Sequence, residues 1–227
     1  MLQFFELFNR GGWVMYVILA VSVYALGIIL YKSYQFASIK LGQTDFADVF
    51  LEQFANQPQG SEQVIAMYTA RLRALHHPLA KVLETALAFS LKPETTQETL
   101  REEVGRVGAR EMAWLESHLR GLDLASNLAP FLGLLGMVLS MVTVFSTIEP
   151  AGSRVDVTLL AGGIWEALLT TVFGLIVAVI AQVGYYNLDS RIERTRLAMN
   201  DASLRLMQLI KLPAGEQQPQ HMLKVVM

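Results

Sequence analysis

Three long apolar segments separate the polar parts of this chain of 227 residues. They span 13–31, 125–148 and 159–187, and few strongly polar side chains interrupt them. A hydrocarbon core of about 30 Å needs roughly 20 helical residues to cross it, so each segment is long enough to be a transmembrane helix. The pattern predicts an all-α integral membrane protein with three spans. The alternative, three buried helices of a soluble protein, is disfavoured by finding three such runs in one short chain.

The first apolar segment also has the length of a secretory signal. Residues 32–35, which follow it, offer no pair of small residues where a signal peptidase would cut. We therefore expect the first segment to be an uncleaved span.

The polar segments carry the periodicity of helices. Apolar residues recur at spacings of three and four over 61–91, after a turn predicted at 57–60. No breaker lies between Thr95 and the second span, so we expect one continuous helical rod from about Thr95 to Thr147. The third span likewise continues as a helix over 188–212, and the proline- and glutamine-rich tail 213–227 is expected to be disordered. The second and third spans are thus predicted to extend beyond the bilayer as long helices.

Lysine and arginine predict the orientation of the spans. Ten of the 18 lie in the helical region 32–124 and six follow residue 187, whereas segments 1–12 and 149–158 hold one each. Segments rich in lysine and arginine remain in the cytoplasm. Residues 1–12 and the short loop 149–158 are therefore expected outside, in the periplasm of a bacterium, and the carboxyl terminus inside.

Composition narrows the function. Hydrophobic residues make up 53% of the chain and charged residues only 17%, below the quarter or so that is usual in soluble domains. The net charge of −2 gives no electrostatic reason to expect nucleic acid binding, and the lack of cysteine excludes a disulfide scaffold and a thiol nucleophile.

The first alternative to a non-catalytic membrane protein is an enzyme. The chain shows no nucleotide-binding loop, no cluster with metal-ligand spacing, and no nucleophile beside a base. His76 and His77 are expected to be solvated in a loop rather than to bind a metal. We therefore predict neither a catalytic residue, nor a metal, nor a cofactor.

Glu166 is the one carboxylic acid in the three spans. An ionisable group inside a membrane is costly and is a functional candidate for that reason. The alternative is a carboxylic acid that only makes hydrogen bonds between helices. Thr170 lies one turn further on the same helical face.

Small residues line both of the later spans. Thr171 shares a face of the third span with Gly174, and Ser140 lies beyond several small residues of the second. Such a stripe allows close helix packing, and it would equally suit a narrow passage with a hydroxyl facing it. Met137 and Thr171 fall at a similar depth, near mid-membrane. The residues expected to permit close packing are Pro130, Gly133, Gly136, Gly163 and Gly174, and the proline is expected to kink its helix.

Two motifs resemble those of a known family. Ala129-Pro-Phe-Leu-Gly-Leu-Leu-Gly136 is similar to the second-span signature of the MotA/TolQ/ExbB proton-channel family. Gly162-Gly-Ile-Trp-Glu-Ala-Leu-Leu-Thr-Thr-Val-Phe-Gly-Leu175 resembles the third-span signature. The number of spans places the chain on the ExbB/TolQ side of the family, and the residues before Glu166 look more like ExbB.

The resemblance implies a proton-channel, or stator, subunit of an energy-transducing motor in the bacterial inner membrane. Such subunits form a homo-oligomeric ring, thought to be a pentamer, around a dimer of an ExbD/TolR-like partner. Protons pass between ring and partner and drive a TonB/TolA-like protein, for outer-membrane import or for envelope maintenance. A passive membrane scaffold, a ring without ion flux, is the alternative.

The resemblance also assigns roles to residues. Glu166 corresponds to the third-span glutamate of the family and Thr171 to its pore threonine, while the proton-carrying aspartate belongs to the partner. The family pattern has a threonine after Gly136, where this chain has Met137. A thioether cannot donate a proton. We therefore hypothesise that Ser140, one turn further, supplies the second pore hydroxyl.

Overall fold

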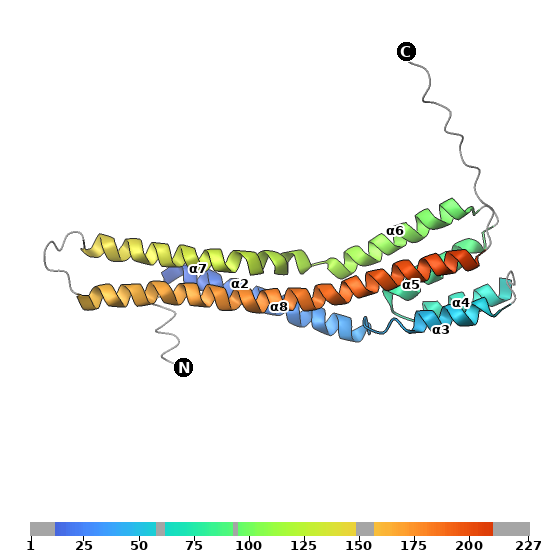
Figure 1. Cartoon of the computed structure of the whole chain (residues 1–227), viewed down its shortest axis with the longest axis horizontal. Coiled ribbons are helices and arrows are strands. Elements are labelled where there is room, and N and C mark those ends of the chain that lie inside the picture. The colour runs from blue at the N-terminus through green and yellow to red at the C-terminus, as the bar shows by residue number, and fades with distance from the viewer. Residues whose placement is uncertain (1–11, 58–61, 93–94, 149–156, 211–227) are drawn as a thin grey trace, which may run out of the picture. The chain divides into compact units, whose positions relative to one another are not determined.

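The computed structural model describes residues 12–57, 62–92, 95–148 and 157–210, and these are helical apart from short connections. The helices follow one another along the chain as α2 to α8 (Figure 1). They group into two compact units. The span unit consists of Met1–Ala37 and Glu116–Ser190, and the amphipathic unit of Ser38–Leu115 and Arg191–Met227. The predicted segment 1–11, most of the loop 149–158, and the tail from residue 211 lie outside the described residues.

The span unit contains the three helices that are long and apolar enough to cross a membrane. They are α2 (Gly12–Ser38), α7 (Leu119–Ile148) and α8 (Val157–Leu209), the last of which continues into the amphipathic unit. Large apolar side chains cover their outer faces, as suits contact with lipid acyl chains. Those most exposed include Trp13, Val23, Leu30, Phe131, Val142 and Val179. The prediction of an all-helical protein with three spans is confirmed.

Helices α7 and α8 approach each other closely where both carry glycine. A Cβ atom added at Gly174 would lie 2.6 Å from the carbonyl oxygen of Ala129, a backbone atom that cannot move aside. A Cβ atom at Gly133 would lie 3.1 Å from the Cα atom of Thr171. Gly163 in turn sits against the side chain of Val144. Since no larger residue fits Gly174 without displacing backbone, its lack of a side chain sets how close the helices come.

The predicted rod from Thr95 to Thr147 is wrong in one respect. Helix α6 (Gln97–Glu116) ends before α7 begins at Leu119, and His118 between them has a positive φ of 70°. A left-handed residue cannot continue a right-handed helix. Pro130 lies inside α7, which continues through it. By contrast, α8 runs from Val157 to Leu209 without a break, as the sequence predicted.

The amphipathic unit is built from α3 (Phe46–Ala55), α4 (Glu62–Arg73), α5 (Pro78–Ser90), α6 and the last part of α8. The helix predicted over 61–91 is therefore two helices. The break comes before Pro78, which occupies the first turn of α5, where its missing N–H costs no hydrogen bond. Leucines and aromatic rings from these helices form one core, which includes Phe50, Phe54, Tyr68, Leu72, Leu79, Leu83, Leu87, Leu100 and Leu206.

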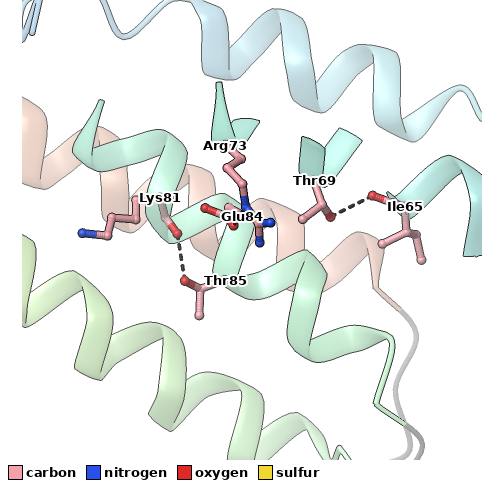
Figure 2. Close-up of polar contacts among 6 residues, drawn as sticks. All are labelled: Ile65, Thr69, Arg73, Lys81, Glu84 and Thr85. Carbon is pink, nitrogen blue, oxygen red and sulfur yellow. Dashed lines mark hydrogen bonds and ion pairs between the residues drawn. The ribbon is translucent and has the colours of Figure 1, made fainter. Parts of the chain in front are cut away.

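Polar contacts tie α4 to α5 at the surface of this unit. Figure 2 shows the guanidinium of Arg73 against the carboxylate of Glu84, with 2.8 Å between Nε and Oε1. Along the two helices, hydroxyls of Thr69 and Thr85 donate to carbonyl oxygens one turn earlier. An exposed ion pair of this kind adds at most about 1 kcal/mol, so the buried core supplies most of the stability.

Candidate functional site

Two threonines of α8 face α7 at the closest approach of the helices. The hydroxyl of Thr171 donates a hydrogen bond across to the Gly133 carbonyl of α7, at 3.3 Å. Thr170 is fully buried, and its hydroxyl donates instead to Ala167 of its own helix at 2.8 Å. The Oγ1 atom of Thr170 lies 3.1 Å from where a Cβ of Gly136 would be. Each glycine of α7 therefore makes room for one threonine.

Glu166 lines a cavity of about 280 Å³ within the span unit. Side chains from all three spans form the cavity wall, and Glu166 itself is half-buried. Two hydroxyls share the space, those of Ser140 and Thr143. The rest of the lining is Gly12, Trp13, Val14, Gly136, Leu139 and Val144. A volume of this size has room for several water molecules, and the carboxyl and hydroxyl groups provide partners for them.

The structure brings Glu166 and Ser140 to one cavity and places Thr171 apart from them. Gly133 of α7 meets Thr171, and Val144 of α7 meets Gly163, so the two helices run antiparallel. Ser140 is seven residues beyond Gly133 in α7, so in this register it lies about two turns from Thr171 along the helix axis. Among the described residues, the Thr171 hydroxyl bonds to Gly133 and not to Ser140.

Met137 follows Gly136 and so lies at about the depth of Thr170. Its side chain is half-buried. The hypothesis that Ser140 supplies the pore hydroxyl that is missing at Met137 stays a prediction.

Sequence reasoning missed Thr143 and the contribution of α2 to the cavity. Thr143 is three residues beyond Ser140, on the same face of α7, and spacing alone could have identified it. The wall formed by Trp13 and Val14 could not be read from the sequence, because it depends on how α2 packs against the other two helices.

The expectation that His77 is solvated is wrong, whereas His76 is exposed. His77 is only 8% exposed, and its Nδ1 atom accepts a hydrogen bond from the Leu79 N–H at 3.1 Å. It therefore caps the start of α5. Burial lowers the pKa of His77 below its ordinary value, and a weaker effect of the Leu41 carbonyl opposes the shift. The described residues contain no group of three histidine or acidic side chains that could hold a metal ion.

Three candidate spans, a close glycine contact between two of them, and a carboxyl group in a cavity among all three define a multi-pass membrane protein. Residues 74–201 match the profile of the MotA/TolQ/ExbB proton channel family. Because this is more than half of the chain, the chain belongs to that family, whose members are channel and transport proteins rather than enzymes.

The chain is similar in sequence to several transport proteins. The chain is 28% identical over 189 residues to a "putative biopolymer transport protein ExbB homolog" of Methanothermobacter thermautotrophicus, covering 83% of this chain and 63% of that protein. It is 32% identical over 151 residues to the biopolymer transport protein ExbB of Xanthomonas campestris pv. campestris, covering 66% of this chain and 56% of the relative. It is also 32% identical over 115 residues to exbB1 of Vibrio cholerae, half of each chain. The chain thus spans between half and two thirds of the length of these relatives.

Proposed function

We propose that this chain is the proton-channel subunit of an energy-transducing motor in the inner membrane of a bacterium. It forms a homo-oligomeric ring, a pentamer in our proposal, around the dimer of an ExbD/TolR-like partner. Proton flow through this assembly drives a TonB/TolA-like protein. Membership of the MotA/TolQ/ExbB family supports this proposal, and so do relatives named as biopolymer transport proteins.

The observation that carries the proposal is the position of Glu166. It is the only carboxylic acid in the apolar segments 13–31, 125–148 and 159–187, and it lines a cavity together with two hydroxyls. A carboxyl group that water can reach is able to take up a proton and release it. In the proposed orientation the cavity lies toward the periplasmic side of Thr171, so Glu166 receives protons before they reach the narrow part of the bundle.

Thr171 is the next group in the proposed path. Its hydroxyl donates to the Gly133 carbonyl, and its two lone pairs remain able to accept a hydrogen bond from water or from the partner. Thr170 is its neighbour in α8, Ser140 lies in the cavity with Glu166, and Met137 leaves an apolar surface where a hydroxyl would otherwise be. Small residues here keep the passage narrow, which favours a proton over a hydrated ion.

A passive ring without ion flux is the alternative function. We would reconstitute the chain in liposomes with and without an ExbD/TolR-like partner, impose a pH gradient, and follow an internal pH dye. Partner-dependent proton entry is the expected result. An assembled complex that is no more permeable than empty liposomes would instead support the scaffold.

Three variants test the two hydroxyls and Met137 in the same assay. Thr171→Val keeps the shape and removes the hydroxyl, so proton entry should fall to the background of empty liposomes. Ser140→Ala should slow the flux, and Met137→Thr should leave it unchanged or raise it. A silent Ser140→Ala together with an inactive Met137→Thr would contradict the proposal that Ser140 replaces the family threonine.

A further inference from the structure

The break between α6 and α7 has no cause in its local sequence. From Ala109 to Arg120 the chain contains neither proline nor glycine, the residues that usually end a helix. Nevertheless the helix stops at Glu116, and His118 adopts a left-handed conformation with φ of 70°. Residues with a Cβ atom rarely do so, although histidine tolerates the region better than most. Contacts from elsewhere in the fold must therefore hold the break.

The carboxyl-terminal part of α2 supplies these contacts. The Lys32 side chain is completely buried, and its Nζ atom donates a hydrogen bond to the Ser117 hydroxyl at 3.1 Å. The neighbouring Tyr31 ring packs edge-on against the His118 ring, with 6.1 Å between centroids. Both residues that interrupt the helix are thus contacted by consecutive residues of α2.

A third contact extends this arrangement into the first turn of α7. A Cβ atom added at Gly121 would collide with the hydroxyl of Tyr24. Tyr24 and Tyr31 are seven residues apart and so lie on one face of α2. Tyr24, Tyr31 and Lys32, which we name the α2 clasp, therefore contact three successive points of the chain from Ser117 to Gly121.

A cation suits this position. The last carbonyl groups of a helix have no partner within the helix and attract positive charge. Ser117 directly follows the last residue of α6, so the Lys32 ammonium lies where such a charge is favourable. The Phe36 ring, 5.6 Å from Nζ at its centroid, adds a further favourable contact for the cation. Burying an ammonium group is costly without such partners.

We propose that Lys32 is a positioning residue, which with the rest of the α2 clasp holds the break between α6 and α7 and fixes where α7 begins. Without the clasp, the stretch around Ser117 regains the continuous helix that its own sequence favours, or fluctuates between the two forms. This inference concerns the conformation of the chain and does not depend on the proposed proton channel.

The experiment measures the distance across the break. The chain has no cysteine, so the exposed residues Glu102 and Leu124 can be replaced by Cys and spin-labelled without further changes. Labelled chains are diluted with unlabelled chains, so that distances between subunits do not contribute. An unbroken helix would separate these positions by about 33 Å. The wild-type break is expected to give a narrow distribution whose maximum differs from this distance.

Lys32→Met preserves the apolar stem and removes the donor. In this variant we expect the maximum of the distance distribution to move toward 33 Å, or the width of the distribution to increase by at least about 50%. Lys32→Arg retains a charged donor and should restore the wild-type distribution. Lys40→Met, which changes an exposed lysine eight residues further on, should leave it unchanged.

A distribution for Lys32→Met that matches wild type would overturn the proposal. So would a Lys32→Arg distribution as wide as that of Lys32→Met, because a charged donor would then not be what matters. If Lys32→Met is not recovered from membranes, Ser117→Ala removes the same hydrogen bond from the other side. Widening in that variant supports the clasp, and no change refutes it.

Discussion

In the span unit, α7 and α8 meet through glycines and hydroxyls, whereas in the amphipathic unit leucines and aromatic rings pack around α5. The difference follows from the surroundings of each unit. Lipid tails are as apolar as leucine, so burying a leucine between two membrane helices gains little, and close backbone approach stabilises the pair instead. In water, removing large apolar surface from solvent is the main driving force. One chain thus uses small residues in one unit and large residues in the other.

The largest effect is expected where a bulky residue is placed at the closest approach of α7 and α8. Gly174→Leu would drive its side chain into the Ala129 carbonyl and the Gly133 backbone, neither of which can rotate away. We expect loss of the assembled protein, measured by native mass spectrometry after extraction in mild detergent. Gly27→Leu is the matched control, because no atom of the described residues lies within 4 Å of a Cβ atom at Gly27. Equal yields of the two variants would show that small size is not required at Gly174.

The opposite change tests the amphipathic unit. Leu87 is fully buried in its core, so Leu87→Ala removes apolar contacts and leaves a cavity. The expected loss is about 2–5 kcal/mol of unfolding free energy. Thermal unfolding in detergent should show a clear decrease in Tm, while the exposed Leu204→Ala should change Tm little. A decrease of similar size in both variants would mean that burial does not distinguish the two positions.

A smaller, pH-dependent effect is expected at His77. Its pKa is lowered by burial in the folded state, so the unfolded chain binds a proton more readily. The stability contributed by neutral His77 is therefore complete above the ordinary pKa of about 6.5 and is lost as the pH falls toward the folded pKa. His77→Asn keeps an acceptor for the Leu79 N–H and cannot titrate in this range.

Thermal unfolding from pH 8 to pH 5 measures this contribution. Wild type should lose more Tm on acidification than His77→Asn does. Parallel curves for the two proteins would show that the buried imidazole does not influence stability.

Much of the fold could be predicted from the sequence, because a helix that crosses a lipid bilayer needs a long run of apolar residues. Long apolar runs predicted the three spans, and the absence of a helix-breaking residue after Tyr185 predicted that α8 is continuous. The break before Pro78 had a local signal, a proline preceded by a capping histidine, that the apolar periodicity obscured. The break at Ser117 and His118 had none, because α2 residues far away in the chain hold it.

The residues of the candidate site could be predicted from the sequence, but which of them share one cavity could not. Glu166, as the only carboxylic acid of the three predicted apolar segments, was identified by the cost of burying charge in a membrane. That it shares a cavity with Ser140 and Thr143, while Thr171 contacts Gly133, depends on the register of α7 against α8. Side-chain spacing along one helix does not determine that register.

Proton flux through Glu166→Gln is the most direct test of the proposed channel. The substitution preserves the shape and the hydrogen bonds of the side chain and removes the titratable proton. In liposomes with the ExbD/TolR-like partner, we predict at least a tenfold lower flux than wild type at equal amounts of assembled complex. Glu193→Gln, which removes an exposed carboxylate of the same helix, should retain the wild-type flux. An assembled Glu166→Gln complex that keeps more than half of the wild-type flux would contradict the account.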